Sequence, residues 1–347
     1  MKKATFQNRI ATVALWLFTL TVLLLIANNV LFSHVSYVTK KEFILPAAVM
    51  FVLAAGVLFL LKKSSGLIGS VAEHFPVIPA VILLFVYQVF VGYEILFLSH
   101  VWDVGTVMDN VYTAIINDGA GLDSDYFSHF PNNRGIFLTE YIGFKLLDLL
   151  GILTLKRGLF AFVVLQCLLS ALTSFVLYRL LEKHAQKTGA FLGWLLYAVM
   201  MGLSGWQVVV YTDMLSLLVP ILVLYLYDNK RSWVWIFVLS YIGYLMKPTA
   251  LIAFLGIAIT EGVRFFSTVT DKGRHNVRTN AKKTAATLCL SLAATVVTGV
   301  VFQALVNATP LSIDEEKNTG PLHMLMMGLN RENDGAIVIT DRKSTRL

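Results

Sequence analysis

Long apolar runs separated by short basic loops constrain this chain more than any other feature of its sequence. A helix needs about 20 apolar residues to cross the hydrocarbon core of a bilayer, and runs of about this length recur from Ile10–Phe32 to Thr284–Val306. The chain is 57% hydrophobic and 14% charged, whereas soluble domains are about 45–50% apolar and about 25% charged. The sequence therefore predicts an all-α, polytopic helical membrane protein.

The distribution of lysine and arginine predicts how the spans are oriented. Cytoplasmic loops are enriched in these residues, and the most basic loop, at 264–283, falls on the same side as the N-terminus when the spans alternate. The pair Lys40-Lys41 then lies outside, which is a small exception. By hydropathy we count about nine spans: Ile10–Phe32, Phe43–Leu61, Val77–Leu98, Phe160–Leu181, Ala190–Trp206, Thr212–Tyr227, Trp233–Met246, Thr249–Val263 and Thr284–Val306.

This topology divides the chain into four regions. Residues 1–98 hold the N-terminal spans, 99–158 form an outer loop with interfacial helices, 159–306 hold the remaining spans, and 307–347 form an outer tail. We expect a multi-pass protein of the cell membrane with a cytoplasmic N-terminus and an extracellular loop. The net charge of +7 is explained by the basic loops, and no basic face with interleaved aromatic residues indicates nucleic-acid binding.

The outer loop is the main polar segment of the chain. From His100 to Glu140 it carries five aspartates and one arginine, Arg134. Val104–Asn117 and Gly135–Leu150 have the pattern of helices that lie on the membrane surface. Glycines at 119 and 121 are expected to end the first helix, and Pro131, Asn132 and Asn133 to form a turn. We interpret Asp118, Asp123 and Asp125 as solvated loop residues.

Asp103 lies where the third span meets the outer loop. A carboxylate at this boundary is partly desolvated, which raises its pKa and suits it to act as a general base. The alternatives are an ordinary solvated acid or a cap for the following helix. Asp109 lies about 240° further around that helix, so the two acids are not expected to form a pair.

Two further polar groups begin spans on the outer side. Asp213, in Tyr211-Thr212-Asp213, is either a helix cap or a site residue. Lys247, next to Pro248, either extends its amine towards water or holds a phosphate. The histidines show no metal-ligand spacing, and no nucleotide-binding glycine motif is present. Both cysteines lie within apolar runs, so neither a disulfide framework nor a metal cluster is expected.

Taken together, these positions resemble the GT-C superfamily of polytopic glycosyltransferases, near the protein-mannosyltransferase and aminoarabinose-transferase type of Gram-positive bacteria. The resemblance covers roughly Leu98 to Leu329, and the first two spans look like an addition before the shared core. The motifs that carry it are Trp102-Asp103, Tyr126–Asn133, the amphipathic helix that follows, Tyr211-Thr212-Asp213, Lys247-Pro248 and His323–Leu329.

The resemblance implies a sugar donor linked to polyprenyl phosphate and a glycan, lipid or protein acceptor at the bilayer. It requires no certain cofactor and leaves a divalent metal open. The lipid phosphate leaves as an anion of low basicity, so the reaction needs a base for the acceptor hydroxyl and a cation for the phosphate. Asp103 matches the base, and Lys247 and Arg134 are candidates to receive the phosphate. The other candidate substrate-binding residues are Asp109, Tyr126, His129, Asn132, Asn133 and Asp213.

Two other function classes remain open: a transporter or flippase for a lipid-linked glycan, and a non-catalytic membrane subunit. A transporter needs polar residues within its spans, and these spans look nearly free of them. After His323–Leu329, the resemblance leads us to expect a glycine-rich stretch and further spans, whereas this chain ends at Lys343–Leu347. We therefore expect a truncated or frame-shifted product, which puts its activity in doubt.

Overall fold

The computed structural model describes residues 63–94, 102–272 and 277–318, together with individual positions between 12 and 56. Helices dominate these residues, and no strand occurs among them. The expected spans Ile10–Phe32 and Phe43–Leu61 fall mostly outside the described residues, as does the whole of His323–Leu329.

Two compact units make up the chain, and the loop helices belong to the larger one. The smaller unit takes in Met1–Val77, Leu177–Leu195 and Leu255–Thr287. The larger unit takes in Ile78–Val176, Leu196–Phe254 and Leu288–Leu347.

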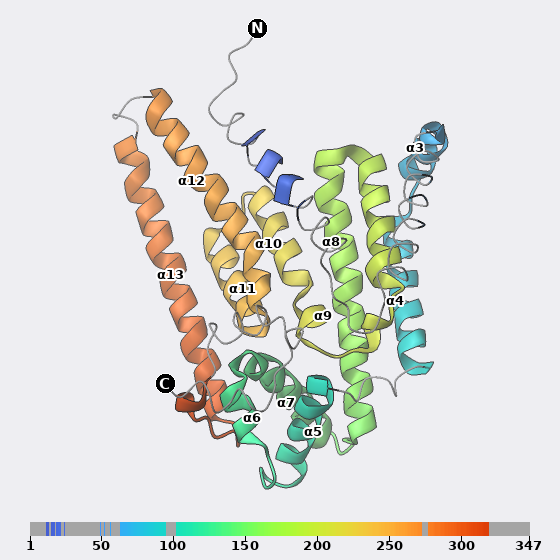
Figure 1. Cartoon of the computed structure of the whole chain (residues 1–347), viewed down its shortest axis with the longest axis vertical. Coiled ribbons are helices and arrows are strands. Elements are labelled where there is room, and N and C mark those ends of the chain that lie inside the picture. The colour runs from blue at the N-terminus through green and yellow to red at the C-terminus, as the bar shows by residue number, and fades with distance from the viewer. Residues whose placement is uncertain are drawn as a thin grey trace. The chain divides into compact units, whose positions relative to one another are not determined.

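The apolar runs form the long helices seen in Figure 1. Among the residues that the structure describes, three stretches are long and apolar enough to cross a membrane: Val77–Glu94, Leu155–Gly202 and Ala285–Asn307. The longest helix contains a sharp turn at Ala185 and Gln186, where the φ of Gln186 is 57°, so it consists of two helices, as the sequence predicts. The helices and their bounds are α4 (Val77–Glu94), α8 (Leu155–Tyr197), α10 (Leu218–Asp228), α11 (Trp233–Met246), α12 (Ile252–Lys272) and α13 (Val277–Asn307).

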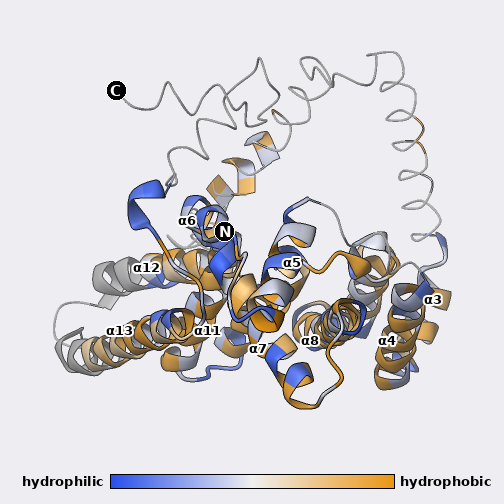
Figure 2. Cartoon of the chain, turned by 90° about the horizontal axis from the view of Figure 1, so that it is seen from below, coloured by the Kyte–Doolittle hydropathy of each residue, from blue (hydrophilic) through white to orange (hydrophobic). Residues whose placement is uncertain are grey.

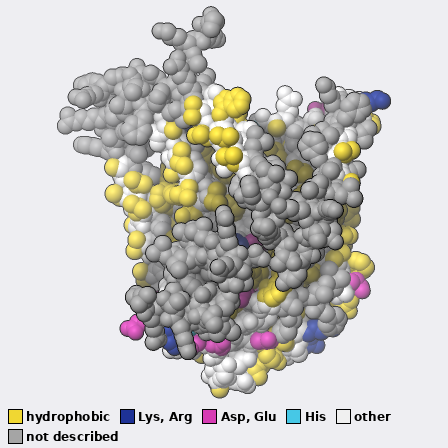
Figure 3. All heavy atoms as spheres, in the orientation of Figure 1, with side chains coloured by type: hydrophobic (Ala, Val, Ile, Leu, Met, Phe, Trp, Pro, Cys, Tyr) yellow, Lys and Arg dark blue, Asp and Glu magenta, His cyan; other side chains and the backbone are white. Residues whose placement is uncertain are grey.

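The outward surfaces of these helices are apolar. Figure 2 shows hydrophobic residues along much of α4 and α13, including exposed Leu83 and Val300. In Figure 3, hydrophobic side chains cover the described flanks, while most acidic and basic side chains lie along the lower edge. Large exposed apolar surfaces on a protein mark contact with another apolar phase, which here is the lipid.

Aromatic packing joins two elements of the smaller unit, α3 and α8. Phe75 follows α3 (Ser65–Glu73), and its ring centroid lies 4.9 Å from that of Phe191 and 5.0 Å from that of Trp194. Lys187 Nζ pairs with the Glu73 carboxylate at 3.0 Å. These contacts join α3 to the turn of α8.

The loop between α4 and α8 forms two helices that the sequence predicts, α5 and α7, and a shorter one, α6, that it does not. Gly119 and Gly121 have φ values of 85° and 84°, a conformation that glycine adopts without steric cost, and they follow the end of the first helix. In Figure 1 the loop helices gather at one end of the larger unit. They are α5 (Trp102–Ile116), α6 (Ser124–His129), the 3-10 helix η2 (Pro131–Asn133) and α7 (Arg134–Leu149).

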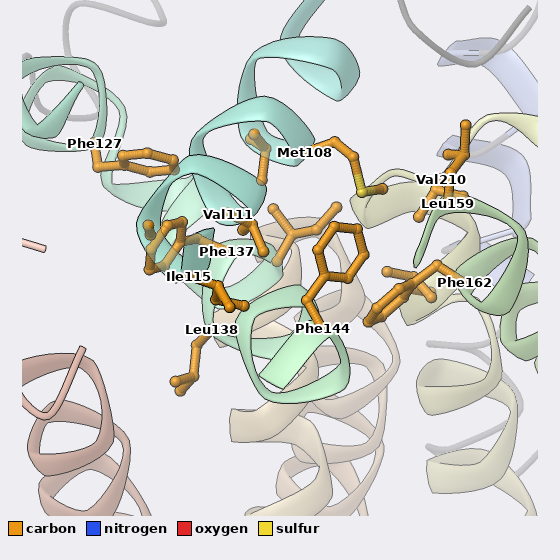
Figure 4. Close-up of a cluster of buried hydrophobic side chains, with 14 of the residues drawn as sticks. Met108, Val111, Ile115, Phe127, Phe137, Leu138, Phe144, Leu159, Phe162 and Val210 are labelled. Atoms are coloured by element: carbon orange, nitrogen blue, oxygen red, sulfur yellow. The ribbon is translucent and has the colours of Figure 1, made fainter. Parts of the chain in front are cut away.

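A buried apolar cluster joins α5, α6 and α7 to the start of α8 (Figure 4). On α5 the buried residues recur every three or four positions, as one face of a helix requires. Phe127 of α6 packs edge-on against Phe137 of α7, with the ring centroids 4.8 Å apart. The ring centroids of Phe144 of α7 and Phe162 of α8 are 6.0 Å apart. The loop is therefore a packed platform whose polar residues are held in place.

The platform is seated on the end of α11. A Cβ atom built on Gly135 would lie 2.2 Å from the carbonyl oxygen of Leu245, so only glycine allows the two backbones to approach this closely. The Thr139 hydroxyl also lies 3.5 Å from the Met246 sulfur. This contact brings the first turn of α7 beside the residue that precedes Lys247.

Candidate functional site

Asp103 begins the site in the first turn of α5. A helix N-terminus carries a partial positive charge that favours a carboxylate, so the position also suits the structural alternative considered from sequence. The side chain is exposed, and the protein itself does not desolvate it. The expected partial desolvation concerns the boundary of the bilayer and stays a prediction.

Tyrosine hydroxyls from two distant segments hold the Asp103 carboxylate. The Tyr211 hydroxyl donates to Asp103 Oδ2 at 3.2 Å and also lies 3.0 Å from Asn133 Oδ1. The amide nitrogen of Asn133 donates to the Tyr126 hydroxyl at 2.6 Å, which leaves the Tyr126 proton for Asp103. Asn133 thus links both tyrosines, and Asp103 accepts from each of them.

The loop fold explains why these residues converge. Asp123 caps α6 by accepting the backbone N–H of Tyr126 at 3.1 Å, and this fixes the start of the helix. Pro131 begins η2, and buried Asn133 ends it. Asn132 donates to Asn133 Oδ1 at 3.0 Å. The turn predicted from Pro131-Asn132-Asn133 therefore orients the amide at the centre of the network.

Electrostatics keep both tyrosines protonated. Burial raises the pKa of the Tyr126 hydroxyl well above its ordinary value, and the Asp103 carboxylate raises it further. Burial and the charge of Asp103 raise the pKa of Tyr211 in the same way, with a smaller contribution from Asp213. At neutral pH the network is a carboxylate supported by neutral donors.

Asp213 and Lys247 form an ion pair next to this network. Asp213 lies in the first turn of α9 (Thr212–Ser216), and Lys247 is the extended residue between α11 and the 3-10 helix η5 (Pro248–Leu251). The side chains are 54% and 28% exposed, respectively. The charge of Asp213 also reaches Tyr211, where it adds to the raised pKa of the hydroxyl.

Arg134 is buried and already engaged. It is 8% exposed, its Nε donates to the Phe127 carbonyl at 3.0 Å, and its Nη1 donates to the Glu315 carboxylate at 2.7 Å. Its Nη2 has no hydrogen-bond partner among the residues that the structure describes. An arginine held in this way is less suited than Lys247 to receive a phosphate.

The segment Thr309–Asn318, which we call the strap, docks onto the loop. The backbone N–H groups of Ser312 and Asp314 donate to the hydroxyls of Ser124 and Ser128 at 3.1 and 3.0 Å. The strap ends in the 3-10 helix η6 (Glu315–Lys317). From the sequence, this segment was expected to be part of an outer tail. Its run of acids followed by a lysine is nevertheless a signal for pairing with charged residues.

Two of the loop acids that were interpreted as solvated have structural roles. Asp123 caps α6, as described above. Asp125 pairs with Lys317 of the strap at 2.7 Å, and this hydrogen bond lowers the pKa of the Asp125 carboxyl and raises that of Lys317. Both side chains are exposed, as the solvated-loop interpretation expects, and the strap adds a partner for Asp125.

The remaining candidates occupy the same platform but not the centre of the network. Asp109 is exposed on α5. His129 ends α6, and its Nδ1 lies 2.8 Å from the carbonyl oxygen of Asp125. No group of three histidine, cysteine or acidic side chains suited to a metal ion occurs among the described residues.

Glu140 is a buried acid that no sequence motif singled out. The helix that contains it was expected to lie on the membrane surface, yet its side chain is 0% exposed. Neither carboxylate oxygen has a hydrogen-bond partner within the described part of the chain. Burial raises the pKa of this carboxyl well above its ordinary value of 4.5. The raised pKa favours the neutral form of the side chain.

The helices of the larger unit also bury polar side chains. Gln88 of α4 donates to Ser170 Oγ of α8 at 3.1 Å, and the hydroxyls of Ser170 and Tyr197 lie 2.9 Å apart. Gln166 and Gln207 are buried as well. The expectation that the spans are nearly free of polar residues is therefore wrong, because scattered uncharged residues converge in the fold.

Apolar helices with a polar platform at one end define an integral membrane protein associated with the lipid bilayer. The chain matches the model of a family described as "Conserved hypothetical integral membrane protein" over residues 3–341, and it belongs to that family. No curated protein matches the chain, and no solved structure matches it either.

Proposed function

We propose that this chain is a glycosyltransferase that moves a sugar from a polyprenyl-phosphate donor to a glycan, lipid or protein acceptor. The observation that carries the proposal is the Asp103 carboxylate, which is exposed yet fixed by the hydroxyls of Tyr211 and Tyr126. An acid that is both accessible and oriented meets the two geometric needs of a general base. The GT-C resemblance supplies the reaction class, and membrane-family membership is consistent with a lipid-linked donor.

In the proposed reaction, the acceptor hydroxyl oxygen attacks the anomeric carbon of the donor sugar. Asp103 takes the hydroxyl proton as the new glycosidic bond forms. The bond between the anomeric carbon and the phosphate oxygen breaks, and its electron pair leaves with the lipid phosphate. In this scheme the hydrogen bonds from Tyr211 and Tyr126 hold the orientation of the Asp103 carboxylate. Its remaining lone pairs are then free to accept the proton of the acceptor hydroxyl.

Lys247 is the cation that we assign to the departing phosphate. Its partner Asp213 is half-exposed, and a phosphate is able to join or replace this carboxylate on the ammonium group. Charge-assisted contacts of this kind are stronger than neutral hydrogen bonds. Asn132 is the amide of the turn that we assign to sugar or phosphate oxygens. Arg134, which Glu315 already binds, supports the loop in this scheme.

The membrane arrangement forms part of the proposal. We propose that the chain crosses the cell membrane about nine times. We place its N-terminus in the cytoplasm and the platform on the extracellular face. The support is the basic loop at 264–283, which shares the side of the N-terminus when the spans alternate.

A transfer assay with matched variants tests the function. Membranes containing the full chain are incubated with radiolabelled polyprenyl-phosphate sugars, and label in acceptor products is measured. We expect transfer by the wild-type chain and a loss of about 100-fold or more in Asp103→Asn, because general-base catalysis contributes about 10²–10⁴-fold. Asp118→Asn is the control, since residue 118 is exposed with φ of 49°, which asparagine tolerates. Full transfer by Asp103→Asn would remove Asp103 as the base.

The buried polar residues of the larger unit favour a second candidate, a transporter or flippase for a lipid-linked glycan. Polar groups within spans are costly and often line a substrate or ion path, and Gln88, Gln166 and Gln207 provide such groups. Reconstituted vesicles with a fluorescent lipid-linked glycan separate the candidates, because translocation without sugar transfer supports the transporter. A third candidate, a non-catalytic subunit, is supported if neither process occurs.

A further inference from the structure

Three buried glutamines surround the irregular segment that follows α8. We call Gln88, Gln166 and Gln207 the amide cluster; they are 0%, 0% and 1% exposed, respectively. They come from α4, from α8 and from the 3-10 helix η4 (Gly205–Val208). All three belong to the larger unit.

The backbone explains why amides are needed here. After Tyr197 the chain forms a π-helical turn, η3 (Ala198–Gly202), and then η4. A broken helix leaves carbonyl groups without their usual partners, and in a membrane protein such groups must be satisfied within the protein. The amide cluster supplies the missing donors.

The hydrogen bonds fix which way each amide points. Gln88 Nε2 donates to the Gly202 carbonyl at 3.1 Å, and Gln207 Nε2 donates to the Met201 carbonyl at 2.6 Å. Gln166 Nε2 donates to the carbonyls of residues 206 and 207, both at 3.0 Å. Because each nitrogen faces a carbonyl, each side-chain oxygen is the atom that is left over.

The three leftover oxygens share one chemical need. Gln88 Oε1, Gln166 Oε1 and Gln207 Oε1 are all buried, and none has a hydrogen-bond partner in the described part of the chain. Leaving a buried acceptor without a partner is costly. All three nitrogens bind carbonyls of residues 201–207, so the three side chains contact the same short segment. Only a hydrogen-bond donor or a cation satisfies them.

We propose that the amide cluster binds a monovalent cation, with Na⁺ as the fitting ion. A water molecule has two protons to donate, which is fewer than the three oxygens present. Discontinuous helices in membrane proteins coordinate Na⁺ through unwound carbonyls and helix C-terminal ends, and the end of α8 provides such a partial negative charge. The cluster has no carboxylate, so its uncharged oxygens suit a single positive charge better than a divalent ion.

This inference is independent of glycosyl transfer. A cation here either stabilises the broken helix or couples an ion to the movement of a substrate. The second role would strengthen the transporter candidate, but binding itself does not require it.

Cation-dependent stability of the purified full chain in detergent micelles tests the proposal. Thermal unfolding is followed in NaCl, KCl and choline chloride at equal ionic strength. For a site occupied at about tenfold above its Kd, we expect Na⁺ to raise the Tm by about 2–4 °C over choline. Equal Tm values in all three salts would overturn the proposal and favour bridging water.

Variants locate the site. Gln166→Leu removes one oxygen, and Gln166→Lys places a tethered ammonium group near the same carbonyls; both are expected to lose the Na⁺-dependent Tm rise. Gln303→Leu, at an exposed position of α13, is the control and should keep it. A full Na⁺ effect in both Gln166 variants would place the cation elsewhere. If the variants fail to fold, direct ²²Na⁺ binding to the wild-type chain decides: saturable uptake supports the site and its absence overturns it.

Discussion

The Tyr211 hydroxyl donates to the Asp103 carboxylate at 3.2 Å across 108 residues of sequence. The bond connects the first turn of α5 to the start of α9. Each of these two elements lies next to an apolar helix in the chain. Because Asn133 is also bound to Tyr211 at 3.0 Å, the turn after α6 joins the same point. The three motifs that sequence analysis singled out separately therefore form one polar network.

Tyr211→Phe should impair the base without disturbing the fold. The change removes one hydroxyl and keeps the ring, so a hydrogen bond to a charged group worth about 1.5–3 kcal/mol is lost. We expect transfer to fall by about tenfold or more.

Far-UV circular dichroism separates positioning from simple loss of structure. Tyr87→Phe is the control, since Tyr87 lies exposed on α4, and its transfer rate should match that of the wild type. A loss of helical signal in Tyr211→Phe that matches its loss of transfer would count against the role of this hydroxyl in orienting Asp103.

Changes to the ion pair of Asp213 and Lys247 should reduce transfer far more than they reduce the Tm. An exposed ion pair contributes about 0–1 kcal/mol, so Lys247→Met should change the Tm little while reducing transfer strongly. The double variant Asp213→Lys with Lys247→Asp restores an ion pair but moves the positive charge. We expect it to keep the fold and remain inactive in the transfer assay, whereas recovered transfer would show that any pair at this position is sufficient.

Much of the fold was predictable because it depends on local pattern. The helix expected at Trp233–Met246 is observed with the same bounds. Of the loop helices, α5 and α7 were predicted to within two residues of their observed ends, and α6 was not predicted. Length, apolar content and glycine punctuation are readable within a short window of sequence. The total number of spans stays a prediction, since three stretches meet the length and hydropathy requirement among the described residues.

The site was predictable only as a set of separate residues. Asp103, Asn133 and Tyr211 were each recognised by motif, but their mutual hydrogen bonds depend on tertiary packing. The pairing of Arg134 with Glu315 spans 181 residues, and no local pattern announces it. Burial of Glu140 was missed for a related reason: its neighbours in sequence suggest a surface helix, whereas packing of α7 decides which face is covered.

Breaking the contact between Arg134 and Glu315 should loosen the strap. Glu315→Gln leaves the buried guanidinium without its carboxylate, and leaving a buried charge without its partner is costly. We expect faster amide hydrogen exchange at Ser312 and Asp314, whose N–H groups bind the loop serines. Glu316→Gln, at the exposed neighbouring residue, is the control. Equal exchange in both variants would show that the backbone bonds hold the strap without the ion pair.

Glu140→Gln should stabilise the protein relative to the wild type, and the difference in stability between the two should grow as the pH rises. Burial raises the pKa of Glu140 in the folded chain well above its ordinary value of 4.5, so both states are protonated at low pH and the carboxyl carries no penalty there. Above pH 4.5 the unfolded chain loses this proton while the folded chain keeps it. The free energy of unfolding of the wild type therefore falls by up to about 1.4 kcal/mol per pH unit until the folded pKa is reached.

Glutamine at this position cannot ionise, so the variant escapes that loss. The difference in Tm between Glu140→Gln and the wild type, measured by tryptophan fluorescence in micelles, should be smallest near pH 4.5 and grow towards pH 8. Glu94→Gln replaces an exposed glutamate at the end of α4 and should follow the wild-type curve. Parallel curves for Glu140→Gln and the wild type would mean that the carboxyl is charged in the fold. A partner would then have to compensate that charge, and α7 would be held by an ion pair rather than by burial of a neutral acid.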